Sequence, residues 1–120
     1  RELFYLEWFT SRGVRLVLTT EDGSTGERGR VTVPLERELQ RATGGVTVYA
    51  CGPEPMLEAV AHVSAKYGRR SQVSVERVMG CGMGGCYSCV IPVKDKTGGH
   101  HYVRSCIGGP VFNGADLAWD

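Results

Sequence analysis

The cysteine-rich stretch at residues 79–89 reads MGCGMGGCYSC, and it decides how the 120-residue chain is interpreted. Three of its cysteines, Cys81, Cys86 and Cys89, follow the spacing C-x4-C-x2-C, and Cys106 stands further along the chain. Glycine fills most of the positions around the first two cysteines. Since glycine reaches positive φ without a steric penalty, this composition predicts a tight loop whose backbone N–H groups turn inward toward the cysteine sulfurs.

This cysteine spacing is typical of a plant-type [2Fe–2S] site. A short loop can supply three thiolates to such a cluster, while a separate strand supplies the fourth. A structural zinc site is the alternative, but zinc knuckles usually contain two C-x2-C pairs and this sequence has one. We therefore predict an electron-transfer module with a [2Fe–2S] cluster on Cys81, Cys86, Cys89 and Cys106.

The sequence before the cysteine loop predicts an α/β fold. Apolar and β-branched residues predict strands at 14–18 and 46–50, with a crossover helix between them at 31–43. A second helix is expected to start near Pro55, since proline is tolerated in a first turn, and to stop at Gly68. Strands that alternate with helices in this way are typical of a parallel sheet.

The composition changes near residues 69–72, where we place a domain boundary. Beyond it, apolar runs at 90–93 and 102–103 flank a polar segment and predict a β-hairpin. Residues 1–70 are therefore expected to be the C-terminal half of a parallel-sheet nucleotide-binding domain. Residues 71–120 are expected to be a small β-rich cluster domain.

Two short motifs fall at the expected carboxyl ends of strands, where ligands bind in open α/β sheets. The first is Cys51-Gly52-Pro53, where backbone N–H groups at a helix start suit a phosphate or a nicotinamide amide. For so short a motif, a tight turn with a buried thiol is the simpler interpretation. The second is Asp22-Gly23-Ser24, which also reads as a solvated loop.

The overall composition argues against several classes of function. A formal net charge of +1 gives no indication of nucleic acid or of an anionic membrane surface as a partner. No apolar run approaches the roughly 20 residues that span a bilayer, and no signal peptide opens the chain, so a cytoplasmic location is expected. The chain begins with Arg1, which indicates a piece of a longer protein. We assign no catalytic residue, because the three histidines have no catalytic partner nearby in the sequence: His62, His100 and His101.

Three motifs, taken in order along the chain, resemble a known family. They are YACGPEPML at 49–57, the cysteine loop at 79–89, and RSC at 104–106 followed by GPVF at 109–112. This order resembles the C-terminal half of the electron-transfer subunit of bacterial NAD-dependent dihydroorotate dehydrogenase. Such subunits have an FAD-binding β-barrel, a ferredoxin-reductase-type NAD-binding domain and a [2Fe–2S] domain.

The resemblance implies residue roles by position. It implies that the four clustered cysteines ligate the cluster, and that Cys51, Gly52 and Pro53 lie beside the nicotinamide and the flavin. It also implies that Asp22, Gly23 and Ser24 face NAD.

The resemblance further implies an oxidoreductase component of pyrimidine biosynthesis. In the family, electrons pass from FMN on a separate dihydroorotate dehydrogenase catalytic subunit, through the cluster, to FAD and NAD, so a hetero-oligomer is expected. The FAD site would lie mostly on the missing N-terminal half, and the fragment alone is not expected to be catalytically complete. Two alternatives stay open: a reductase subunit of a sulfhydrogenase or of an anaerobic sulfite reductase, and a zinc-stapled interaction domain without redox activity.

Overall fold

The computed structural model describes residues 3–119, and the chain divides into two compact units between Pro34 and Leu35. The first unit contains one short helix and two short parallel strands: α1 (Leu6–Thr10), β1 (Thr19–Thr20) and β2 (Glu27–Arg28). Helix α2 (Thr32–Arg41) begins at the end of this unit and continues into the second.

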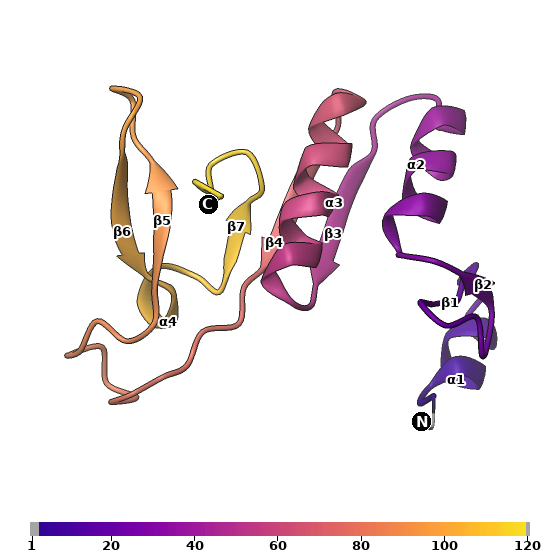
Figure 1. Ribbon diagram of the computed structural model, residues 1–120, viewed down its shortest axis with the longest axis horizontal. Helices are drawn as coiled ribbons and strands as arrows, with labels where there is room; N and C mark the ends of the chain where they lie inside the picture. The colour runs from indigo at the N-terminus through magenta and orange to yellow at the C-terminus, as the bar shows by residue number, and fades with distance from the viewer. Residues whose placement is uncertain (1–2, 120) are drawn as a thin grey trace. The chain divides into compact units, whose positions relative to one another are not determined.

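The second unit is a mixed α/β structure with two small sheets (Figure 1). Its further elements are β3 (Thr47–Cys51), α3 (Glu54–Lys66), β4 (Arg70–Ser74), β5 (Val90–Lys94), β6 (His100–Arg104), α4 (Ser105–Gly108) and β7 (Val111–Asn113). Strands β3 and β4 are parallel, and β7 pairs with β4 in the antiparallel sense. Strands β5 and β6 form a separate antiparallel hairpin, as the sequence predicts.

Strand β3 and helix α3 lie where the sequence predicts a strand and a helix, and the parallel strand β4 follows them. Pro53 caps α3 and Pro55 lies in its first turn, where a missing N–H removes no helical hydrogen bond. At the other end Gly68 takes a φ of 63°, and the Arg69 N–H donates to the Ser64 carbonyl at 2.9 Å. The buried face of α3 consists of residues at helical spacing: Leu57, Val60, Ala61 and Ser64. The predicted bounds of the strand at β3 and of the helix at α3 are therefore confirmed to within one or two residues.

Two apolar cores hold the second unit together. One joins α2, β3 and α3 around Leu39, Val48 and Val60. The other joins α3, β4, β5 and the C-terminal segment around five buried residues: Leu57, Val73, Val75, Ile91 and Leu117. The hairpin is thus attached to the β3–α3–β4 unit by a shared core. The domain boundary near residue 70 stays a prediction.

The C-terminal segment extends the hairpin's contacts. The Lys94 N–H donates to the Asp116 carbonyl at 2.7 Å, and the Ala118 N–H donates to the Pro92 carbonyl at 3.1 Å. These bonds lay the segment antiparallel along β5, beside the buried side chain of Leu117. One edge of β5 therefore pairs with β6 and the other with the chain's own C-terminal segment.

The strand predicted at 14–18 is wrong. Those residues take no strand conformation, and the nearest strand is the two-residue β1 that follows them. A strand needs a partner for its backbone groups, and within the described part of the first unit β1 and β2 pair over two residues each. Apolar composition shows that a segment can be a strand, but it does not show whether a neighbour is available.

Helices long and apolar enough to traverse a lipid bilayer do not occur among residues 3–119.

Candidate metal centre

The cysteine loop, which carries Cys81, Cys86 and Cys89, runs from β4 to the start of β5 (Figure 1). The Ser88 hydroxyl donates to the Val78 carbonyl at 3.0 Å and closes the loop at its base. Inside the loop, Gly82 and Gly84 take φ values of 66° and 78°, the region that favours glycine. The glycines therefore make the tight turn that the sequence predicts.

Cys81 accepts hydrogen bonds from two backbone amides. The Met83 N–H and the Cys86 N–H donate to the Cys81 sulfur at 3.4 Å and 3.5 Å. The backbone N–H of Cys86, then that of Met83, then the Cys86 thiol lower the pKa of the Cys81 thiol to about 6. A methyl group on Gly80 would lie 3.2 Å from the Cys86 sulfur. The loop therefore favours a thiolate at Cys81 and leaves room for the sulfur of Cys86.

Cys89 and Cys106 form a second pair. Cys89 is buried and ends the loop, while Cys106 lies in α4, directly after β6. The backbone N–H of Cys106 and then its thiol lower the pKa of the Cys89 thiol, and the Cys89 side chain raises the pKa of the Cys106 thiol. The buried Ser105 donates its hydroxyl and its N–H to the Cys89 carbonyl at 2.9 Å and 3.0 Å. The segment with the fourth cysteine is thus fixed to the end of the loop.

The four predicted ligands therefore fall into two pairs: the Cys86 N–H donates to the Cys81 sulfur, and Cys106 lowers the pKa of the Cys89 thiol. Among residues 3–119, no three His, Cys, Asp or Glu side chains gather closely enough to hold a single metal ion. A tetrahedral zinc site needs four ligands around one ion, whereas a [2Fe–2S] cluster takes two protein ligands on each of two irons. Four cysteine thiols are the donor set that a [2Fe–2S] cluster takes, so the residues present fit such a cluster.

Two residues beside Cys106 contact the middle of the loop. The guanidinium of Arg104 donates to the Gly84 carbonyl, and its carbon lies 5.1 Å from the centre of the Tyr87 ring. A methyl group on Gly84 would lie 2.6 Å from Cδ1 of Ile107, so the loop backbone packs closely on that side chain. Arg104 and Ser105 were not predicted to be site residues, although both stand next to Cys106 in the sequence.

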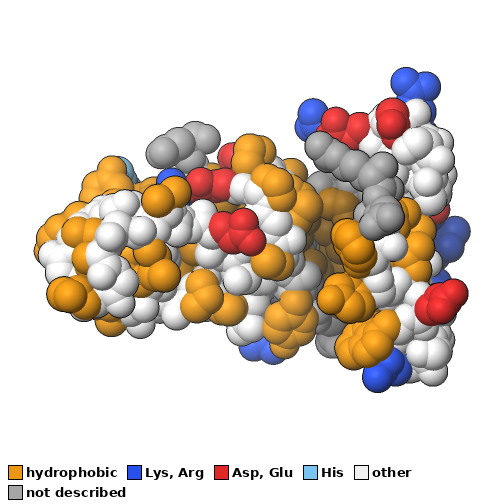
Figure 2. All heavy atoms as spheres, turned by 90° about the horizontal axis from the view of Figure 1, so that it is seen from below, with side chains coloured by type: hydrophobic (Ala, Val, Ile, Leu, Met, Phe, Trp, Pro, Cys, Tyr) orange, Lys and Arg blue, Asp and Glu red, His pale blue; other side chains and the backbone are white. Residues whose placement is uncertain are grey.

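The surface around the cysteine loop is apolar. Five large hydrophobic side chains in and beside the loop are exposed: Val78, Met79, Met83, Tyr87 and Ile107. Met83 is 85% exposed, so it does not pack inward. Figure 2 shows hydrophobic side chains over the hairpin end of the second unit, with few charged side chains among them. This surface suits contact with another protein.

The Cys51-Gly52-Pro53 motif joins the end of β3 to the start of α3. Gly52 takes a φ of 153°, and a methyl group there would lie 2.5 Å from Cε of Met56. The thiol of Cys51 is exposed, so its interpretation as a buried core thiol is wrong. Glu54 in the first turn of α3 pairs with Arg77 at 2.6 Å. The motif therefore presents an accessible thiol at a strand end, which is a position where ligands bind.

Asp22, Gly23 and Ser24 lie in the first unit, in the loop between β1 and β2. The Ser24 N–H donates to Oδ1 of Asp22 at 3.0 Å, and this bond lowers the pKa of the Asp22 carboxyl. Gly23 takes a φ of 75°. The loop borders a hollow of about 640 Å³ lined by Leu3, Thr20, Glu21, Asp22, Ser24 and Thr25. The role of this loop in NAD binding stays a prediction.

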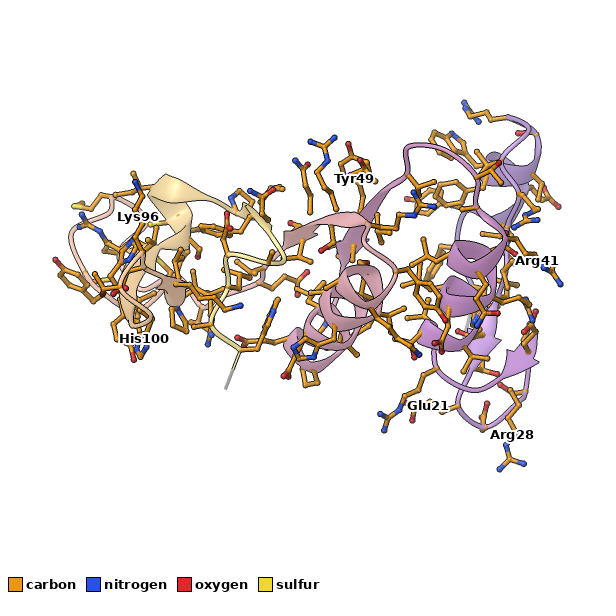
Figure 3. All side chains as sticks on the ribbon, turned by 90° about the horizontal axis from the view of Figure 1, so that it is seen from above. Glu21, Arg28, Arg41, Tyr49, Lys96 and His100 are labelled. Atoms are coloured by element: carbon orange, nitrogen blue, oxygen red, sulfur yellow. The ribbon has the colours of Figure 1, made fainter. Side chains whose placement is uncertain are left out.

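The three histidines lie outside the cysteine loop. His62 lies in α3, and His100 and His101 lie at the start of β6. The rings of His100 and Tyr102 meet edge to face at 5.3 Å. Figure 3 shows His100 and Lys96 on the hairpin, well away from Tyr49 on β3. We assign the histidines no role in the candidate metal centre.

Comparison with known proteins gives a consistent set of relatives. Residues 76–118 match the family described as the iron–sulfur cluster binding domain of dihydroorotate dehydrogenase B. The electron transfer subunit of dihydroorotate dehydrogenase B (NAD(+)) from Caldanaerobacter subterraneus subsp. tengcongensis is 42% identical over 93% of this chain and 43% of its own length. The subunit of the same name from Fusobacterium nucleatum is 38% identical over 97% of this chain and 42% of its own. The chain thus spans less than half the length of these relatives.

A solved structure supports the same fold. The NADH-dependent reduced ferredoxin–NADP oxidoreductase, studied for flavin-based electron bifurcation, aligns with a TM-score of 0.75 and 25% identity. The alignment covers 95% of this chain and 39% of that one. The α/β class predicted from the sequence is therefore confirmed at the level of a mixed fold with a ferredoxin–NADP oxidoreductase as neighbour.

Proposed function

We propose that the chain carries a [2Fe–2S] cluster for electron transfer between flavins, because residues 76–118 match the iron–sulfur cluster binding domain of dihydroorotate dehydrogenase B. The supporting observation is a set of hydrogen bonds: the Cys86 N–H donates to the Cys81 sulfur, and Ser105, next to Cys106, donates twice to the Cys89 carbonyl. These four residues are the ligands in this proposal. When bound, such a cluster takes up and releases one electron at a time, and so links flavins that exchange two.

The chain's own residues prepare the site for that group. The amides of Met83 and Cys86 point at the Cys81 sulfur and stabilise its thiolate. Ser105 holds the carbonyl of Cys89 with two hydrogen bonds and so sets where Cys106 stands. The burial of Cys89 keeps water from one side of the site, while the exposed Met83 and Tyr87 leave another side open to a partner.

In this proposal the rest of the chain binds NAD. Residues 1–70 form the C-terminal half of a parallel-sheet NAD-binding domain, and residues 71–120 form the small cluster domain. The parallel pair β3 and β4, joined through α3, and the likeness to an NADH-dependent reductase support this assignment. The proposed nicotinamide contacts are Cys51, Gly52 and Pro53 at the exposed end of β3, with Asp22, Gly23 and Ser24 as further NAD contacts.

The whole protein is, in this proposal, the electron-transfer subunit of an NAD-dependent dihydroorotate dehydrogenase in cytoplasmic pyrimidine biosynthesis. The names of the relatives support this, as does their greater length, which leaves room for the FAD site. The partner is an FMN-containing catalytic subunit in a hetero-oligomer. Electrons pass from dihydroorotate through FMN, the cluster and FAD to NAD. The exposed apolar surface at the cysteine loop supports a protein partner there.

Co-expression tests this function. The full-length subunit that contains this chain is produced with a candidate FMN-containing subunit, and the complex is isolated through a tag on the first. We expect FMN to co-purify and dihydroorotate to reduce NAD. The Cys106→Ser variant should lose NAD reduction by dihydroorotate, while flavin-linked oxidation of NADH by an artificial acceptor persists. Dihydroorotate-dependent NAD reduction that is unchanged in Cys106→Ser would show that electrons bypass this site.

A further inference from the structure

Arg104 connects the two parts of the candidate metal centre. It is the last residue of β6 and stands two positions before Cys106. Its guanidinium reaches back to the cysteine loop, where it donates to the Gly84 carbonyl and lies over the ring of Tyr87 at 5.1 Å. Gly84 lies between the first two cysteines and Tyr87 between the second and the third. One side chain therefore contacts both halves of the loop from the segment that carries the fourth cysteine.

We propose that Arg104 is a positioning residue that clasps the C-x4-C-x2-C loop to the Cys106 segment and thereby holds the two thiol pairs in register before and after metal binding. The redox consequence rests on the proposed [2Fe–2S] function, whereas the clasp itself is a property of the chain. The arrangement suits arginine in particular. Its planar fork donates to a carbonyl while its face stacks on an aromatic ring, which a lysine ammonium does not reproduce.

The surroundings of the clasp explain why it is needed. The loop is irregular and largely exposed, and its glycines give the unfolded chain much conformational freedom. The hydrogen bonds of Ser105 fix the end of the loop at Cys89, which is outside residues 82–87. Arg104 acts at Gly84, on the same residue that packs against Ile107. The contacts of Arg104 and Ile107 flank Cys106 and place the middle of the loop beside it.

Arg104 also adds a fixed positive charge beside the four predicted thiolates. A cluster with four thiolate ligands is anionic, and reduction makes it more negative. A nearby cation therefore favours the reduced form, because net charge is one of the factors that set cluster potentials. The charge of Arg104 and its contacts with the loop are separate effects. A lysine at position 104 keeps the positive charge but loses most of the contacts with Gly84 and Tyr87.

The test compares three variants of the full chain. Arg104→Met removes both effects, Arg104→Lys keeps the charge, and Lys96→Met is a matched control that removes a cation from the exposed turn of the same hairpin. The measurements are amide hydrogen exchange of residues 82–87 in the metal-free chain, the rate of metal release to a chelator, and the midpoint potential. Exchange in β3 and β5 reports in the same samples whether each variant folds.

The proposal predicts a pattern across these measurements. Arg104→Met should release metal roughly tenfold faster, the factor for the loss of one charge-assisted hydrogen bond of about 1.4 kcal/mol. It should exchange faster at residues 82–87 and lower the potential. Arg104→Lys should restore the potential but not the slow release, and Lys96→Met should match the wild type.

Two results would overturn the clasp. Exchange at residues 82–87 that is the same in Arg104→Met and in the wild type would show that the contact does not order the loop. Full recovery of slow metal release in Arg104→Lys would show that only the positive charge of Arg104 matters, and not its contacts with Gly84 and Tyr87. A wild-type chain that takes up zinc and no cluster would refute the proposed function instead. The exchange measurement on the metal-free chain would still decide the clasp in that case.

Discussion

Ser105 donates two hydrogen bonds to the same carbonyl oxygen, that of Cys89, through its hydroxyl at 2.9 Å and its N–H at 3.0 Å. Both residues are buried, and they belong to the two segments that meet at the candidate metal centre. The third predicted ligand and the segment with the fourth are thus joined by protein contacts alone. This connection bridges the cysteine loop and the end of β6.

Removal of the Ser105 hydroxyl should weaken this connection. We expect Ser105→Ala to lower the free energy of unfolding by about 1 kcal/mol, a typical value for one buried hydrogen bond, and to speed metal release. Denaturant unfolding of the metal-loaded chain measures the first effect. Ser88→Ala is the matched control, because the Ser88 hydroxyl makes an exposed bond to the Val78 carbonyl and should cost less. Equal stability of Ser105→Ala and the wild type would contradict this role.

The contact between α2 and α3 should respond to acid. The Lys66 ammonium and then the Tyr67 hydroxyl lower the pKa of Glu36, and Glu36 raises the pKa of Lys66. The lowered pKa of Glu36 means that its contribution is complete above its ordinary value of 4.5 and is lost as pH falls through the folded pKa. The contribution of Lys66 is complete below 10.5 and is lost as pH rises through its folded pKa.

The measurement is the free energy of unfolding between pH 6 and pH 3. We expect Glu36→Gln to lose less stability across this range than the wild type, since it has no carboxylate to protonate. Glu21→Gln is the control, because Glu21 is an exposed carboxylate in the first unit. The account of this ion pair fails if Glu36→Gln follows the wild-type curve.

Metal removal should affect one part of the second unit first. The segment from residue 72 to 120 has short strands and an irregular loop, and small metal-bound modules depend on their metal for folding. After treatment with chelator and reductant, we expect the amides of β5 and β6 to lose hydrogen-exchange protection before those of α3. The shared core around Ile91 and Leu117 should slow this loss without preventing it. Equal protection with and without metal would contradict the prediction.

The exposed Met83 side chain tests the partner surface. Met83→Glu places a charge in the apolar surface at the cysteine loop. If the proposed function holds, this variant should bind the proposed FMN-containing subunit more weakly and slow NAD reduction by dihydroorotate. The cluster spectrum should not change, because the Met83 side chain is 85% exposed. Tyr102→Glu is the control, since Tyr102 is an exposed residue of β6 outside the loop. Unchanged affinity, or loss of the cluster itself, would place the interface elsewhere.

Local patterns predicted much of this fold. Helix α3 begins and ends where proline and glycine indicate, and the β5–β6 hairpin forms where apolar runs flank a polar segment. The strand predicted at 14–18 failed, and β7 was not anticipated, because strand pairing depends on distant partners that periodicity does not identify.

The candidate site divides in the same way. The spacing of the cysteines predicted which thiols to consider, and the structure brings those thiols together as two pairs. Arg104 and Ser105 stand beside Cys106 in the sequence, but their contacts with Gly84 and Cys89 depend on the tertiary position of β6 and were not predicted. The ligand assignment stays a prediction.

Iron and sulfide content, measured together with the visible spectrum after anaerobic reconstitution, decides whether the four clustered cysteines hold a [2Fe–2S] cluster. The account predicts about two irons and two sulfides per chain in the wild type and in Cys51→Ser, with a visible spectrum that bleaches on reduction. Cys106→Ser, and likewise a serine at any of the other three clustered cysteines, should lose the colour or hold iron only weakly. A colourless wild type with one zinc ion, or loss of iron in Cys51→Ser with full retention in Cys106→Ser, would contradict it.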